Sequence, residues 1–94
     1  MALFHLSFDL NREAANYNAK HAKVTETIRQ MQYLHLMGST YVVSTNASAD
    51  QIVAAIGQHL DGNDRLLVTA ITSAHRSVVD GWLTPGERQW MFGS

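Results

Sequence analysis

The chain has 94 residues and a hydrophobic content of 46%, which suffices for one domain with a modest core but not for two. Seven basic and eight acidic side chains leave a formal net charge of −1, which excludes the strongly basic surface that tight non-specific binding of duplex nucleic acid requires. The absence of cysteine excludes disulfides, zinc–thiolate centres and thiol catalysis. No apolar run approaches the roughly 20 residues that cross a bilayer, and no signal-peptide pattern is present, so the sequence predicts a cytoplasmic protein without a membrane partner.

The first segment, LFHLSFDLN at residues 3–11, alternates between apolar and polar side chains. This period of two predicts a β-strand with one face turned towards the core. The apolar face comprises Phe4, Leu6, Phe8 and Leu10. The opposite, uncovered face comprises His5, Ser7 and Asp9. Asp is depleted in strand interiors, so the acid at the end of this strand needs an explanation.

An amphipathic helix is predicted after the turn formers NREAAN at residues 11–16. Its buried face is defined by apolar side chains at offsets of 7, 11 and 14 from the first: Tyr17, Val24, Ile28 and Met31. Basic side chains fall largely elsewhere on this helix and, with Arg12 before it, form the only basic grouping: Lys20, Lys23 and Arg29.

Two short β-rich runs around Gly38, in YLHLMGSTYVVST, predict a hairpin over residues 33–45. The following SADQ is a capping box, with Ser48 as the N-cap and Gln51 three residues later. It starts a second helix, whose predicted buried residues are Ile52, Val53, Ile56 and Leu60. The DGND run at residues 61–64 is expected to stop this helix with Gly62 and Asn63 at positive φ.

The last strand is predicted at residues 65–72, RLLVTAIT, and its apolar character on both faces predicts a place inside the sheet. Residues 73–83 read as a loop with an edge strand, and TPGE starts a helix with Thr84 as the cap. Two large aromatic side chains in this tail, Trp82 and Trp90, are expected to seal a dimer or an open sheet edge.

The element order predicts an α+β, ferredoxin-like βαββαβ fold, with an antiparallel sheet and two helices on one face. We expect a single domain over residues 1–94, in which residues 72–94 form a C-terminal extension that covers the sheet or a dimer interface.

Four segments carry a resemblance to known families: LSFDLN, GSTYVVSTN, SADQI and LDGNDRLLV. Together they resemble the VapD-type toxins and the small ferredoxin-fold nuclease subunit of CRISPR adaptation machinery, in particular the relatives labelled SinR-family. The resemblance covers residues 3–71. It implies a homodimer whose sheets meet and, in active members, a metal-dependent endonuclease mechanism.

The resemblance assigns the chemistry to an aspartate at the end of the first strand, and the matching residue is Asp9. One carboxylate holds Mg²⁺ poorly, but a two-fold dimer would bring a second Asp9 close to the axis, where a cation would relieve the repulsion. The predicted function is therefore a Mg²⁺-dependent, toxin-like endoribonuclease, with Ser7 assisting Asp9. The basic stretch of the CRISPR subunit is thin here, with Arg12 followed directly by Glu13.

Several alternatives remain open for these residues. Asp9 could instead cap the DLNRE turn through an Asx-type hydrogen bond. RNA or DNA is expected to contact four residues, although a solvated helix face is the favoured interpretation of the lysines: Asn11, Arg12, Lys20 and Lys23. His5 is a weaker candidate for a general base. The alternative function is a non-catalytic homodimeric scaffold or antitoxin-like interaction module of the same fold.

Overall fold

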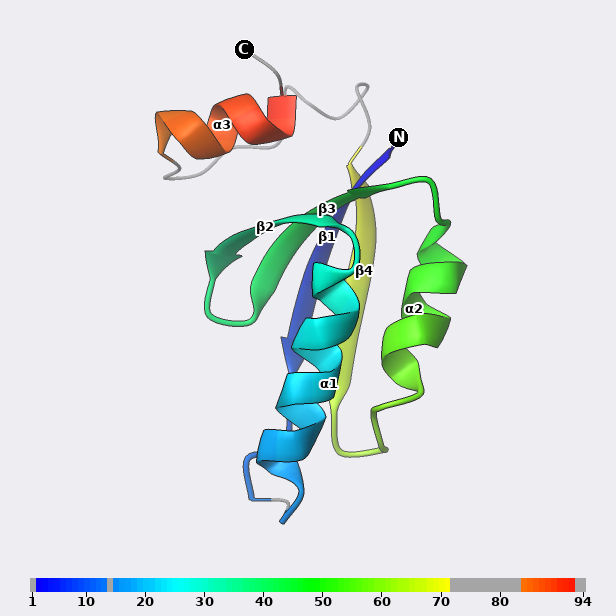
Figure 1. Cartoon of the computed structure of the whole chain (residues 1–94). Coiled ribbons are helices and arrows are strands. Elements are labelled where there is room, and N and C mark those ends of the chain that lie inside the picture. Colours follow the sequence, from blue (N-terminus) through cyan, green and yellow to red (C-terminus); the bar gives the residue numbers. More distant parts are fainter. Residues whose placement is uncertain (1, 14, 72–83, 93–94) are drawn as a thin grey trace.

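The computed structural model describes residues 2–13, 15–71 and 84–92. The elements are β1 (Ala2–Asp9), α1 (Tyr17–Arg29), β2 (Gln32–Met37), β3 (Thr40–Thr45), α2 (Ala49–Gly57), β4 (Arg65–Ile71) and α3 (Pro85–Phe92). Up to β4 this is the predicted βαββαβ order, and α3 adds a helix within the C-terminal extension (Figure 1). None of the described helices is long and apolar enough to cross a membrane.

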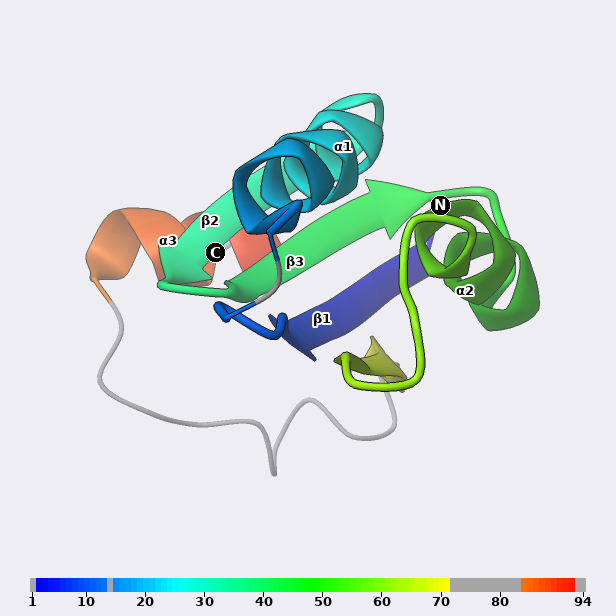
Figure 2. The ribbon, with the colours of Figure 1, turned by 90° about the horizontal axis from the view of Figure 1, so that it is seen from below.

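The four strands form one antiparallel sheet in the order β2-β3-β1-β4, so β1 and β3 are central and β2 and β4 are edges. Helices α1 and α2 lie on the same side of this sheet (Figures 1 and 2). The α+β ferredoxin-like prediction is therefore confirmed.

The core lies between this sheet and its two helices. Its fully buried members include Leu6 from β1, Val24 and Ile28 from α1, and Ile56 from α2, each with 0% of its surface exposed. Tyr17 and Met31, the outer members of the predicted α1 face, are partly buried against this cluster, so that face is confirmed. The alternation of β1 is confirmed as well: its even-numbered positions from 4 to 8 are buried, and Asp9 is exposed.

The prediction that residues 65–72 form an interior strand is wrong. β4 pairs only with β1 and is an edge strand. Leu67 lies opposite Ser7, on the face that α1 and α2 leave uncovered, and 57% of its surface is exposed. The apolar side chain of Leu67 on the second face of β4 is therefore exposed, so apolar residues on both faces do not mean burial on two sides.

Two details of the second helix also differ from the prediction. Val53 is 44% exposed, because α2 turns only the row of Ile52 and Ile56 into the core. Among the described residues, Gly38 has the only positive φ, at 28°, so Gly62 and Asn63 do not end the helix in that conformation. The helix ends instead at Gly57 with an ordinary helical turn at the C-cap.

The predicted caps at the starts of α2 and α3 agree with the structure. The SADQ capping box is complete, with both reciprocal hydrogen bonds between Ser48 and Gln51. Thr84 and Glu87 form the same arrangement at the start of α3. Helix α3 contacts β2, and Trp90 is 37% exposed. The loop and strand predicted at residues 73–83, with Trp82, lie outside the described residues.

Candidate active site at the end of β1

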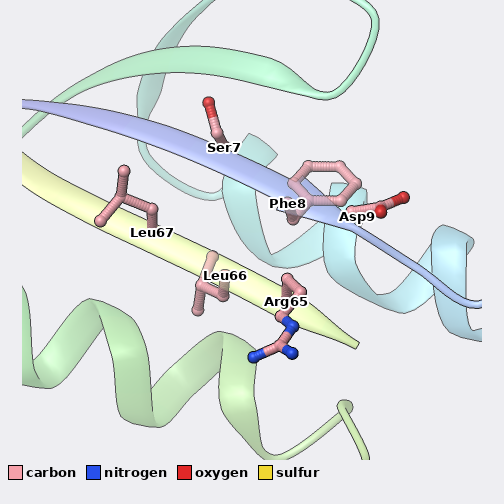
Figure 3. A pocket seen from close by; sticks show the side chains of 6 residues that line it. All are labelled: Ser7, Phe8, Asp9, Arg65, Leu66 and Leu67. Carbon is pink, nitrogen blue, oxygen red and sulfur yellow. The ribbon is translucent and has the colours of Figure 1, made fainter. Parts of the chain in front are cut away.

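Asp9 closes β1 beside the first residue of β4. The antiparallel register places it directly opposite Arg65, and Figure 3 shows the two charged groups extending in different directions. Within the described part of the chain, no hydrogen bond or ion pair engages the Asp9 carboxylate. Asp9 is therefore an exposed acidic residue that no described residue holds in place.

Two open depressions border Asp9. The first, of about 280 Å³, lies along β1 and β4 and has mostly apolar walls; its lining residues are Ser7, Phe8, Asp9, Arg65, Leu66 and Leu67 (Figure 3). The second, of about 460 Å³, lies over the turn after β1 and is more polar; its lining residues are Asp9, Leu10, Asn11, Arg12, Glu13 and Asn63. The Asp9 carboxylate thus borders both an apolar surface and a polar one.

The turn beside Asp9 is held by Asp64, whose side chain is 0% exposed. The carboxylate accepts hydrogen bonds from the Asn11 amide at 2.9 Å, from the Asp61 amide at 3.0 Å and from the Lys20 ammonium at 2.7 Å. These bonds join the end of β1, helix α1 and the loop before β4. Asp64 therefore fixes the position from which Asp9 projects.

The prediction that Lys20 belongs to a solvated basic face is wrong. Its side chain is 4% exposed, and its ammonium lies 2.7 Å from carboxylate oxygens of both Asp61 and Asp64. The hydrogen bond to Asp61, followed by that to Asp64, raises the pKa of Lys20. A lysine near the start of the helix stays charged inside the fold only because these two acids meet it from a loop more than 40 residues away in sequence.

The hydrogen bonds also lower the pKa of both acids. Lys20 is the main cause for Asp61, whose side chain is half exposed. For Asp64, the bond from Lys20 and then that from the Asn11 amide hold the pKa at about 2, below its ordinary 3.8.

This shift predicts a dependence of stability on pH. Because the pKa of Asp64 is lower in the folded chain than in the unfolded chain, its carboxylate stabilises the fold fully above its ordinary pKa of 3.8 and loses this contribution as the pH falls towards about 2. We expect Asp64→Asn to melt well below the native chain at neutral pH, and this difference to shrink steadily in acid. Thermal unfolding followed by circular dichroism would measure it, and an undiminished difference near pH 2 would contradict the assignment.

The other predicted contact residues divide between two places. Asn11 uses its side-chain oxygen to accept the Glu13 amide at 3.1 Å, so the Asx turn considered for Asp9 belongs to Asn11. The Arg12 guanidinium lies 5.9 Å from the centre of the Tyr17 ring and borders the polar depression. Lys23 is exposed and lines a separate groove between α1 and α2, so it is not brought together with Asp9.

Ser7 is half-buried on the open face of β1, beside Asp9. Its hydroxyl lies 3.0 Å from His5 Nε2 and 3.2 Å from the Thr40 hydroxyl of β3. Ser7 also lines the first depression with Asp9 and Arg65. The structure therefore brings Ser7 and Asp9 to one surface, as the alternation of β1 predicted.

The resemblance implies a bound metal ion, and the residues around Asp9 show whether they could hold one. In the described ranges there is no group of three His, Asp or Glu side chains able to hold an ion. Two acidic residues, Asp9 and Glu13, line the polar depression. Mg²⁺ is commonly held by one or two carboxylates while it keeps several waters and shares substrate phosphates. The donors fit that mode and do not fit a closed, all-protein metal cage.

Sequence reasoning missed the residues that come to Asp9 from other elements. Arg65 and Leu67 enter the site through the β1–β4 register, and Asn63 enters through the preceding loop. The one sequence signal that could have placed Arg65 beside Asp9 was the RLLV run, because a strand that pairs antiparallel to β1 begins where β1 ends.

Comparison with known proteins adds one finding to this geometry. No protein-family model and no curated protein matches the sequence. Among solved structures, Cas2 of Streptococcus pyogenes is similar with a TM-score of 0.66 at 16% sequence identity, over 86% of this chain and 99% of that chain. The likeness shows a shared fold and agrees with the resemblance to the CRISPR group, whereas the VapD-type and SinR names stay predictions.

Proposed function

We propose that this protein is a metal-dependent nuclease that cleaves RNA as a homodimer, with Asp9 of each subunit close to the two-fold axis. The observation that carries the proposal is the Asp9 carboxylate, which is exposed, unengaged by the described residues and bordered by two open depressions. The fold shared with Cas2 supports the same assignment.

Two features of the sheet, the edge strand β4 and the exposed Leu67, are arguments for the proposed homodimer. β4 is an edge strand, and edge strands with exposed apolar side chains are prone to pair with another chain. Leu67, which is 57% exposed, lies next to Ser7 and Asp9 in the first depression. An isologous interface over this region would cover Leu67 and repeat Asp9 across the axis.

Each nearby side chain has a defined part in this proposal. Asp9, with Glu13 beside it, would hold Mg²⁺, which supplies activation of water and neutralises charge on the phosphate. Arg65 and Arg12 border the two depressions and would hold phosphate oxygens. Lys20 has no part in contacting the substrate, because its ammonium is occupied by two carboxylates.

Removal of the metal provides the test. We expect the native protein to cleave single-stranded RNA with Mg²⁺ or Mn²⁺, to stop in excess EDTA and to recover when Mg²⁺ is restored. Parallel reactions with single- and double-stranded DNA define the substrate, and sedimentation measures the oligomeric state. Cleavage that persists in EDTA, or activity in a strictly monomeric protein, would overturn the proposal.

The second candidate is a non-catalytic homodimeric scaffold or antitoxin-like module. It is favoured by the formal net charge of −1 and by the lack of a three-ligand metal group in the described ranges. A stable dimer with no heat of Mg²⁺ or Mn²⁺ binding and no cleavage of any nucleic acid would support this candidate over the nuclease.

A further inference from the structure

Three hydrogen-bonded polar side chains form a chain across the open face of the sheet, and the middle one lines the depression beside Asp9. This chain consists of His5 and Ser7 on β1 and Thr40 on β3, which lies directly opposite Ser7 in the strand register. Its two contacts measure 3.0 Å, from His5 Nε2 to the Ser7 hydroxyl, and 3.2 Å, from that hydroxyl to Thr40. All three residues are half-buried, so water competes only partly for these bonds.

Which group donates each of these two hydrogen bonds depends on whether Nε2 of His5 carries a proton. A hydroxyl donates one hydrogen bond and can accept others. When Nε2 of His5 carries no proton, Ser7 donates to it and accepts from Thr40. When Nε2 carries a proton, it donates to Ser7, and Ser7 must donate to Thr40 or to a group in the depression. The Ser7 hydroxyl therefore couples the protonation of His5 to whatever lies on the other side of Ser7.

Ser7 connects this chain with the candidate active site. It lines the same depression as Asp9 and Arg65, whereas His5 does not line it. His5 also lies four residues from Asp9 along β1, too far along the strand to share its ligand position. Of the three side chains, Ser7 is the one that both contacts His5 and lines the depression.

We propose that His5 is the general base of the Asp9 site and that Ser7 relays the proton to it. This inference rests on the proposed nuclease function. In the step, a water oxygen forms a bond to phosphorus as the bond from phosphorus to the leaving sugar oxygen breaks. The water proton passes to Ser7 as the Ser7 proton passes to His5 Nε2, and the leaving oxygen takes a proton from solvent. The imidazolium then returns its proton to solvent.

Among the residues that the structure describes, few charged groups face His5. Its direct cross-strand neighbours, Val42 on β3 and Thr69 on β4, do not titrate in this range. The charged groups at the end of this face are Asp9 and Arg65. Helix α3, which contacts β2, carries Glu87 and Arg88, and Glu87 accepts the Thr84 amide. Histidine side chains in general change charge between about pH 5 and 8.

The first test locates the proton on the His5 ring directly and does not require the protein to cleave RNA. Nitrogen chemical shifts of the His5 ring in the native protein should show Nε2 unprotonated and Nδ1 protonated near neutral pH. Ser7→Ala should remove this preference, while His59 keeps its shifts as an internal reference. A proton on Nε2 of His5 at neutral pH would overturn the relay, whether or not the protein cleaves RNA.

The second test reads the reaction. The native rate of RNA cleavage should rise with pH through the histidine range, and His5→Gln should lose this rise with a rate lower by about 100-fold. The matched control is His59→Gln, at a residue that lines the groove between α1 and α2, and it should keep the native profile. If the native protein cleaves and His5→Gln keeps the pH dependence, the relay is wrong and the nuclease stands. If the native protein does not cleave at any pH, the nuclease proposal itself fails.

Discussion

Asp9→Asn is expected to abolish metal-dependent RNA cleavage, with a loss of about 100-fold or more in kcat. The amide keeps the shape of the side chain but carries no negative charge, so it cannot offset a divalent cation. The fold should not change, because no described residue forms a hydrogen bond or ion pair with the Asp9 carboxylate. Melting temperature and sedimentation of the variant should therefore match those of the native protein.

The matched control for this experiment is Glu26→Gln. Glu26 is an exposed acid on α1 that lines the groove between α1 and α2, away from Asp9. It tests whether the loss of any one negative charge lowers the rate. Calorimetric titration with Mn²⁺ should show weaker binding in Asp9→Asn but not in Glu26→Gln. Equal cleavage rates in Asp9→Asn and in the native protein would remove Asp9 from the mechanism.

Among single substitutions of the described lysines and arginines, Lys20→Met is expected to produce the largest loss of stability, because Lys20 is buried. Methionine fills the space of the lysine stem but removes the ammonium that lies 2.7 Å from Asp61 and Asp64. Asp64, at 0% exposure, would then keep its charge with only two backbone amides as donors. Breaking a buried pair from one side is strongly destabilising, and we expect the melting temperature to fall by about 10 °C or more.

Lys23→Met is the control for this variant, because Lys23 is exposed on the same helix and no ion pair is found for it within the described residues. Its melting temperature should stay close to that of the native protein. Pairing Lys20→Met with Asp64→Leu removes both charges and should recover part of the lost stability. Equal melting temperatures for Lys20→Met and Lys23→Met would show that the buried pair contributes nothing.

The sequence was sufficient to predict those features of the fold that depend on residues close together in the chain. The alternation of LFHLSFDLN predicted which side of β1 faces the core, and the 3.6-residue period predicted the buried face of α1. The capping boxes at Ser48 and Thr84 predicted the starts of α2 and α3. These signals are readable because the physical partners lie within four residues of one another.

Contacts between segments that are distant in the sequence could be identified only from the packed structure. Lys20 looks like any exposed lysine until Asp64 meets it from 44 residues away, and β4 looks buried until the strand order places it at an edge. No described residue engages the Asp9 carboxylate; Asn11 takes the Asx turn instead, and Asp64 holds the backbone beside it. The periodicity of one segment does not predict such contacts, because they depend on how the helices and strands pack against one another.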